Sequence, residues 1–240
     1  MFWPEGEHVL QLYPHTAAEA AIGTAFAADG LRQQDSVVVI ATSALWERLL
    51  GQLQAMGIDA HGAVADGRLR PFGAHTVLAA ARPEDTLRAI LRFARTSPGR
   101  LRVVSELTDL AWRKGDQEAA LAVERRWNAF ARSEAFSLLC ACGLDALDAG
   151  AYEGALASLG ALHTHLAPVD NCEAFDDAVG RAAAEVLEPR LLRMVHSLSA
   201  AHRPAIHLPS GVALLFWLKQ HMPRTAEKVL ARSRTRWIPR

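Results

Sequence analysis

An acidic side chain follows an apolar run in the segment RLRVVSELTDLAW (100–112). Leu101 and Val103 give the pattern of a buried strand, and Glu106 and Asp109 come shortly after it. In proteins that hydrolyse nucleotides, a carboxylate in such a position holds the metal ion beside the phosphates. Nucleotide hydrolysis also requires a loop that binds the phosphates. The protein can therefore carry out this chemistry only if the turn after the first strand forms such a loop.

The turn after the first apolar run lacks the features of a phosphate-binding loop. Such a loop has the pattern GxxxxGK[ST], in which backbone amides hold the phosphates and the lysine supplies charge. The segment here, YPHTAAEAAIG (13–23), has no lysine and no glycine before Gly23, and Pro14 removes an amide donor. The sequence therefore predicts an ordinary strand-to-helix turn, no cofactor, no catalytic residue and no ATP hydrolysis.

The elements that must position these residues alternate between strand and helix up to about residue 150. Apolar runs predict strands over 8–13, 36–42, 67–73, 101–107 and 136–142. Helical patterns occupy 17–31, 44–57, 83–96 and 117–131. The expected fold is α/β: a doubly wound, mostly parallel sheet with helices on both faces.

Local signals predict where the first two helices begin and end. Thr16 is expected to cap the first helix in a capping box with Glu19, and Gly30 is expected to end it. Ser43 is expected to cap the second helix, which Gly57 closes.

The strand signals stop after about residue 150, and the remaining segments look helical apart from the proline-containing break at 203–211. We therefore predict two domains, an α/β domain of residues 1–170 and a helical extension of residues 171–240. From Lys219 to Arg240 the chain has seven Lys or Arg residues against one acid, Glu227. This basic tail could contact DNA, dock a protein partner or serve only as structure.

Composition indicates an ordinary globular protein. The 26 Lys and Arg residues balance the 26 Asp and Glu residues, so whole-chain charge gives no reason to expect a nucleic acid or membrane partner. An odd, small number of cysteines favours a reducing compartment. Because there is neither a signal-peptide pattern nor an apolar run long enough to cross a bilayer, we expect a cytoplasmic protein.

The order of the segments resembles the MEDS domain, the methanogen/methylotroph DcmR sensory domain, over roughly residues 5–170. The resemblance is carried, in chain order, by HVLQLY, QQDSVVVIAT, LWERLLGQLQAMGIDAHGAVADGRLRPF, RLRVVSELTDLAW, AVERRWNAF and FSLLCAC. The pattern of MEDS domains is similar to that of KaiC-type RecA-like ATPases, and the MEDS domains look like relatives of these enzymes that have lost the phosphate-binding loop. The resemblance implies a bacterial or archaeal input domain that senses small organic compounds, often joined to a histidine kinase or a DNA-binding output.

The resemblance also implies site residues. Glu106 and Trp112 match an acid and a tryptophan after the fourth strand, and Glu124 and Asn128 match an acid and an asparagine in the next helix. Glu124 and Asn128 are four residues apart, so they share a helix face. Plainer readings stay open: Glu106 as a solvated or hydrogen-bonded strand-end residue, Trp112 as core, and the helix pair as a solvated face.

Three further residues complete the predicted ligand site. Tyr13 ends the first strand, and ligands of open α/β sheets bind outside the carboxyl ends of the strands. The family pattern has a histidine near HTH, which suggests His163 and His165. The predicted ligand-binding set is Tyr13, Glu106, Trp112, Glu124, Asn128, His163 and His165.

The cysteines have several possible roles. Cys140 and Cys142 are two apart on a predicted strand and therefore point to one face. With the two histidines of HTH they would give four zinc ligands, but the spacings differ from those of known zinc sites. We predict buried thiols and no metal, with a redox or a metal role for these residues and Cys172 as the open alternatives.

Together these observations predict a non-catalytic sensory or adaptor protein of bacterial signal transduction. The expected partners are a small organic ligand and a histidine kinase, a response regulator or a sigma-factor regulator. The first alternative is a transcription regulator that binds DNA through the basic C-terminal helix. The second is an atypical nucleotide-binding enzyme.

Overall fold

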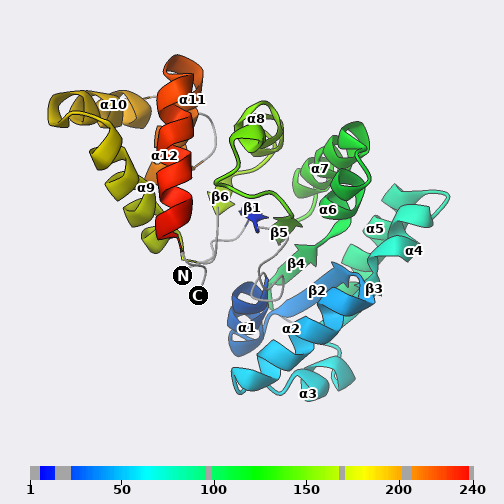
Figure 1. Cartoon of the computed structure of the whole chain (residues 1–240). Coiled ribbons are helices and arrows are strands. Elements are labelled where there is room, and N and C mark those ends of the chain that lie inside the picture. The colour runs from blue at the N-terminus through cyan, green and yellow to red at the C-terminus, as the bar shows by residue number, and fades with distance from the viewer. Residues whose placement is uncertain (1–5, 14–22, 96–98, 168–170, 202–206, 238–240) are drawn as a thin grey trace. The chain divides into compact units, whose positions relative to one another are not determined.

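The computed structural model describes residues 6–13, 23–95, 99–167, 171–201 and 207–237 (Figure 1). The chain divides into two compact units. The first contains Met1–Val9 and Ala18–Cys142, and the second contains Leu10–Ala17 and Gly143–Arg240. Each unit is described by itself below.

The strands confirm the predicted parallel sheet. They are β1 (His8–Leu12), β2 (Ser36–Ala41), β3 (Leu69–Gly73), β4 (Leu101–Ser105), β5 (Ser137–Cys142) and β6 (His165–Ala167), in the order β3-β2-β4-β5-β1-β6. The pairs β2–β3, β2–β4 and β4–β5 are parallel. Every residue of β2, β4 and β5 is buried, which explains why these strands read as continuous apolar runs rather than alternating ones.

The helices of the first unit cover both faces of its strands (Figure 1). They are α1 (Thr24–Arg32), α2 (Ser43–Ala55), α3 (Ala60–Ala65), α4 (Ala74–Ala79), α5 (Pro83–Ala94), α6 (Leu107–Arg113) and α7 (Gln117–Ala131). Along the sheet, the chain moves from β2 to β3 in one direction and from β4 to β5 in the other. Because crossover connections are right-handed, the helices of these two connections must lie on opposite faces of the sheet. Side-chain bonds agree, since Thr24 of α1 donates to Gln52 of α2, whereas Arg126 of α7 contacts Glu84 of α5.

The second unit is mainly helical. It contains η1 (Ala149–Tyr152), α8 (Ala155–Gly160), α9 (Cys172–Val186), α10 (Pro189–Ala201), α11 (Ser210–His221) and α12 (Pro223–Arg236). The rings of Tyr152 and Phe216 meet edge to face at 5.0 Å, so contacts join the segment before residue 170 to the extension after it. Whether residues 1–170 fold alone stays a prediction.

The expectation that strands stop after residue 150 is wrong. The three-residue strand β6 forms a parallel bridge between His165 and His207, in which His207 donates its amide to Thr164 and accepts from Leu166. A strand of three residues is too short to show a hydrophobic periodicity. Its partner, His207, lies in the proline-containing segment that was predicted to be a break.

The helix boundaries differ from the predictions in two places. Thr42, not Ser43, caps α2, because its hydroxyl accepts the amide of Leu45 at 3.4 Å. Gly57 follows this helix with φ of 74°, as a closing glycine does. Gly30 does not end α1, which continues to Arg32. The predicted capping box of Thr16 and Glu19 lies outside the described residues.

Gly30 provides space rather than a helix stop. A Cβ atom at this position would lie 2.7 Å from Cδ of Arg102, a buried residue of β4. Arg102 cannot easily move away, because its guanidinium lies 2.9 Å from Asp29 and 2.8 Å from Asp35. It also lies 5.3 Å from the ring centroid of Phe26. The glycine therefore allows α1 to pack on a buried ion-paired network.

Replacing Gly30 by alanine is expected to destabilise the protein by about 1–3 kcal/mol, the usual cost of overpacking. The matched control is Gly51→Ala in α2, where an added Cβ meets nothing within 4 Å and alanine should stabilise the helix by about 0.5–1 kcal/mol. Urea denaturation of both variants measures the two effects. Equal changes in the free energy of unfolding would contradict the packing role of Gly30.

Candidate functional site

Glu106 lies where β2 and β4 end side by side. These neighbouring strands continue in opposite directions along the sheet, and such switch points are where ligands of open α/β sheets bind. The backbone amide of Thr42 donates to Oε2 of Glu106 at 2.6 Å, and the amide of Glu106 donates to Ile40 at 2.9 Å. The residue is 5% exposed, so the solvated reading is wrong, whereas the hydrogen-bonded reading and the ligand-binding reading both stay open.

Burial raises the pKa of Glu106, and the nearby carboxylate of Asp109 raises it further. The hydrogen bonds from Thr42 and the charge of Arg113 act in the opposite direction without cancelling the shift. Asp109 is itself fully buried and ion-paired at 2.6 Å to Arg113, whereas Trp112, on the same helix, is half-buried. Glu106 therefore holds its proton to higher pH than a solvated glutamate does.

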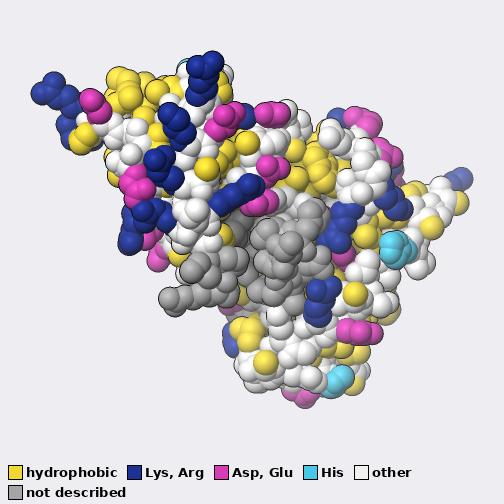
Figure 2. Space-filling model, in the orientation of Figure 1, with side chains coloured by type: hydrophobic (Ala, Val, Ile, Leu, Met, Phe, Trp, Pro, Cys, Tyr) yellow, Lys and Arg dark blue, Asp and Glu magenta, His cyan; other side chains and the backbone are white. Residues whose placement is uncertain are grey.

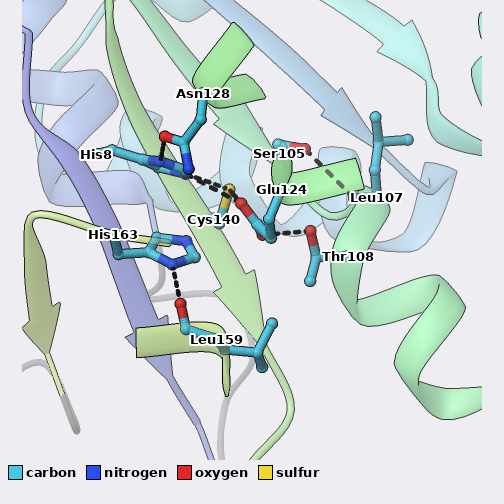
Figure 3. A network of polar contacts seen from close by, with 9 residues as sticks. All are labelled: His8, Ser105, Leu107, Thr108, Glu124, Asn128, Cys140, Leu159 and His163. Carbon is cyan, nitrogen blue, oxygen red and sulfur yellow. Dashed lines mark hydrogen bonds and ion pairs between the residues drawn. The ribbon is translucent and has the colours of Figure 1, made fainter. Parts of the chain in front are cut away.

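A second polar group lies at the junction of β1 and α7 (Figure 3). His8 uses both ring nitrogens: Nδ1 lies 3.1 Å from Oδ1 of Asn128, and Nε2 lies 3.1 Å from Oε2 of Glu124. Glu124 and Asn128 thus share a helix face as predicted. The solvated-face reading is wrong for Glu124, whose side chain has no exposure to solvent.

Cys140 of β5 completes this group (Figure 3). Its Sγ lies 3.4 Å from Nε2 of His8 and 3.5 Å from Oε2 of Glu124. The hydroxyl of Thr108 donates to the other carboxylate oxygen, Oε1 of Glu124. We call His8, Glu124 and Cys140, with Asn128 and Thr108 around them, the buried polar cluster.

Burial disfavours the thiolate forms of both cysteines of β5. Burial raises the pKa of Cys140 well above its ordinary value, and the carboxylate of Glu124 adds to the shift. Burial and the charge of Asp109 raise the pKa of Cys142 in the same way. Because the thiolate is the reactive form, these thiols fit the predicted buried role better than a redox role.

The remaining predicted residues belong to the second unit. Tyr13 is 6% exposed. His163 is 6% exposed, and its Nδ1 lies 2.7 Å from the carbonyl of Leu159. His165 is half-buried and stacks on His207 with ring centroids 5.0 Å apart. A ligand-binding role for the seven predicted residues stays a prediction.

The sequence reasoning missed His8, Thr108 and Cys140 as members of one site. A signal for His8 was present, since it alternates with Leu10 and Leu12 and therefore faces the same side of its strand as two core residues. A histidine in that position is buried and needs a polar partner. The partner itself could not be deduced, because it comes from a helix 116 residues further along the chain.

Comparison with known families matches residues 7–158 to MEDS, the MEthanogen/methylotroph, DcmR Sensory domain. The chain belongs to the MEDS family. A search of curated proteins gives no match. The MEDS match includes β1 to β5 and the whole buried polar cluster, and it ends before the helices α9–α12. Within the described ranges, no helix is both long enough and apolar enough to cross a membrane.

The raised pKa of Glu106 predicts a pH-dependent stability. The folded MEDS protein binds the proton of Glu106 more tightly than the unfolded chain does, in which the pKa of this glutamate is near 4.5. The stabilisation by Glu106 is therefore complete below that pH and is lost as the pH rises through the folded pKa. The unfolding free energy of the wild type minus that of Glu106→Gln should fall with increasing pH and then level off.

Urea denaturation from about pH 4 to about pH 8 measures this difference. The control is Glu47→Gln, a change at an exposed position of α2, for which the difference should stay flat. A flat difference for Glu106→Gln as well would show that the carboxyl titrates alike in the folded and unfolded chains.

Proposed function

We propose that this MEDS protein is a non-catalytic sensory domain that binds a small organic molecule and transmits its occupancy to a signalling partner. The family is one of sensory domains, which supports the signalling role. The observation that carries the site is the buried Glu106, held by the amide of Thr42 at the carboxyl ends of β2 and β4. This position is the usual ligand-binding position of a doubly wound sheet.

Glu106 can give such a ligand one fixed polar contact. Oε2 is bound by the amide of Thr42, which fixes the orientation of the carboxyl group. We propose that Oε1 contacts the ligand, as an acceptor when ionised and as a donor when protonated. Trp112 is the proposed apolar neighbour, because small-molecule sites combine apolar walls with a few polar groups. Tyr13, Glu124, Asn128, His163 and His165 remain further candidates.

We also infer descent from a KaiC-like or RecA-like ATPase with a degenerate phosphate loop. In this interpretation Glu106 is the remnant of the metal-holding acid, reused to contact a ligand. The missing lysine after the first strand supports the loss of nucleotide chemistry, although the loop, residues 14–22, lies outside the described residues.

ATP hydrolysis is expected to be absent, because no lysine or glycine-rich turn follows β1 to hold the phosphates. Phosphate release from ATP and Mg²⁺ with the purified chain should equal that of a protein-free control, and ATP should leave the melting temperature unchanged. A steady ATPase rate that disappears in Glu106→Gln would instead support the atypical nucleotide enzyme.

A panel of small organic compounds tests the sensory proposal. A compound that raises the melting temperature of the wild type should bind Glu106→Gln about tenfold or more weakly, since a hydrogen bond to a charged group contributes about 1.5–3 kcal/mol. Titration followed by tryptophan fluorescence measures the affinity, with Glu47→Gln as the matched exposed control. Equal affinities for the wild type and Glu106→Gln would remove Glu106 from the site.

DNA binding through the basic tail is the weaker alternative. Lys219, Arg232, Arg234 and Arg236 all lie within 4.0 Å of carboxylates of their own unit, on Glu153, Glu185, Asp145 and Asp148. Figure 2 shows Lys and Arg side chains interspersed with acidic ones over this region. Such internal pairing reduces the positive field that attracts DNA phosphates. Docking of a histidine kinase, a response regulator or a sigma-factor regulator is therefore the proposed role of the extension.

A further inference from the structure

We propose that His8, Glu124 and Cys140 bind a divalent transition-metal ion, with Zn²⁺ as the best fit. This site is separate from the proposed ligand contact at Glu106 and does not depend on it. The three residues offer one nitrogen, one oxygen and one sulfur, and these atoms lie within 4.8 Å of one another. Imidazole, carboxylate and thiolate are the three groups that hold zinc in proteins.

The distances between the donor atoms fit one face of a coordination tetrahedron. Zinc bonds of about 2.0–2.3 Å place neighbouring donors about 3.4–3.6 Å apart. The observed separations are 3.1 Å between His8 Nε2 and Glu124 Oε2, 3.4 Å between His8 Nε2 and Cys140 Sγ, and 3.5 Å between Cys140 Sγ and Glu124 Oε2. An ion can therefore be accommodated with displacements of a few tenths of an ångström.

The surrounding residues orient the donors as outer residues of metal sites do (Figure 3). The amide oxygen of Asn128 lies 3.1 Å from Nδ1 of His8, so it accepts the proton on Nδ1 and leaves Nε2 for the metal. Thr108 donates to Oε1 of Glu124, which directs Oε2 toward His8 and Cys140. Both ligand groups thus have a fixed orientation before any ion binds.

A divalent ion would also balance the charge of the cluster. Glu124 has no exposure to solvent, and burying a carboxylate costs several kcal/mol that its partners must offset. A zinc ion with one carboxylate and one thiolate ligand is neutral overall.

The rival explanation is a buried ion pair between a protonated His8 and Glu124. It accounts for the 3.1 Å contact between Nε2 and Oε2 without any metal. It gives Cys140 no essential part, however, whereas the metal site needs the sulfur. The thiol of Cys140 therefore separates the two explanations, and Cys142, which is two residues further on the same buried strand, is the matched control.

The decisive experiment titrates the full-length chain with Co²⁺ after removal of metals by a chelator. One equivalent should bind and give the near-ultraviolet charge-transfer absorption of a cobalt thiolate, which Zn²⁺ then removes by displacement. The absorption should be lost in Cys140→Ser and kept in Cys142→Ser and Cys172→Ser. Asn128→Ala should weaken Zn²⁺ binding about 10–100-fold, and His8→Gln and Glu124→Gln should weaken it more.

Absence of binding, or a cobalt thiolate absorption that survives in Cys140→Ser, would overturn the proposal. So would an equal loss in Cys142→Ser. If Cys140→Ser fails to fold by circular dichroism, X-ray absorption of the wild-type zinc complex replaces it. One sulfur at about 2.3 Å with lighter atoms at about 2.0–2.2 Å would support the site, and a first shell without sulfur would refute it.

Discussion

A carboxylate with no access to solvent, Glu124, ties together four elements of the first unit. Its two oxygens contact Thr108 of α6, Cys140 of β5 and His8 of β1, while Glu124 itself stands on α7. Each partner reduces a desolvation cost that an isolated buried charge would impose on the fold. A shift in the register of β1 or β5 would separate the group, so the carboxylate specifies how these strands align as well as how α7 docks.

Arg102 has a comparable role on the other side of the sheet. It stands on β4, is almost fully buried, and pairs with Asp29 of α1 and with Asp35, which directly precedes β2. The face covered by α1 and α2 therefore contains a buried cation, and the face covered by α6 and α7 contains a buried anion. Because apolar packing tolerates small changes of alignment, these paired charges give each face a specific arrangement.

The accuracy of the sequence predictions follows the physical source of each signal. β2 was predictable because SVVVIAT is β-branched throughout, and α7 because its apolar stripe extends over its whole length. The prediction that Gly30 ends α1 was wrong because the sequence alone does not distinguish a glycine that makes room for Arg102 from a glycine that ends a helix. Glu106 was identified from its place after an apolar strand, but the buried polar cluster was not, since its members are joined only by the fold.

β1 is divided between the two compact units, with His8 and Val9 in the first and Leu10 to Leu12 in the second. The histidine of the buried polar cluster therefore stands two residues before the second unit begins. β1 is thus a backbone segment that both units share, and no linker separates the proposed metal ligand His8 from the first residue of the second unit.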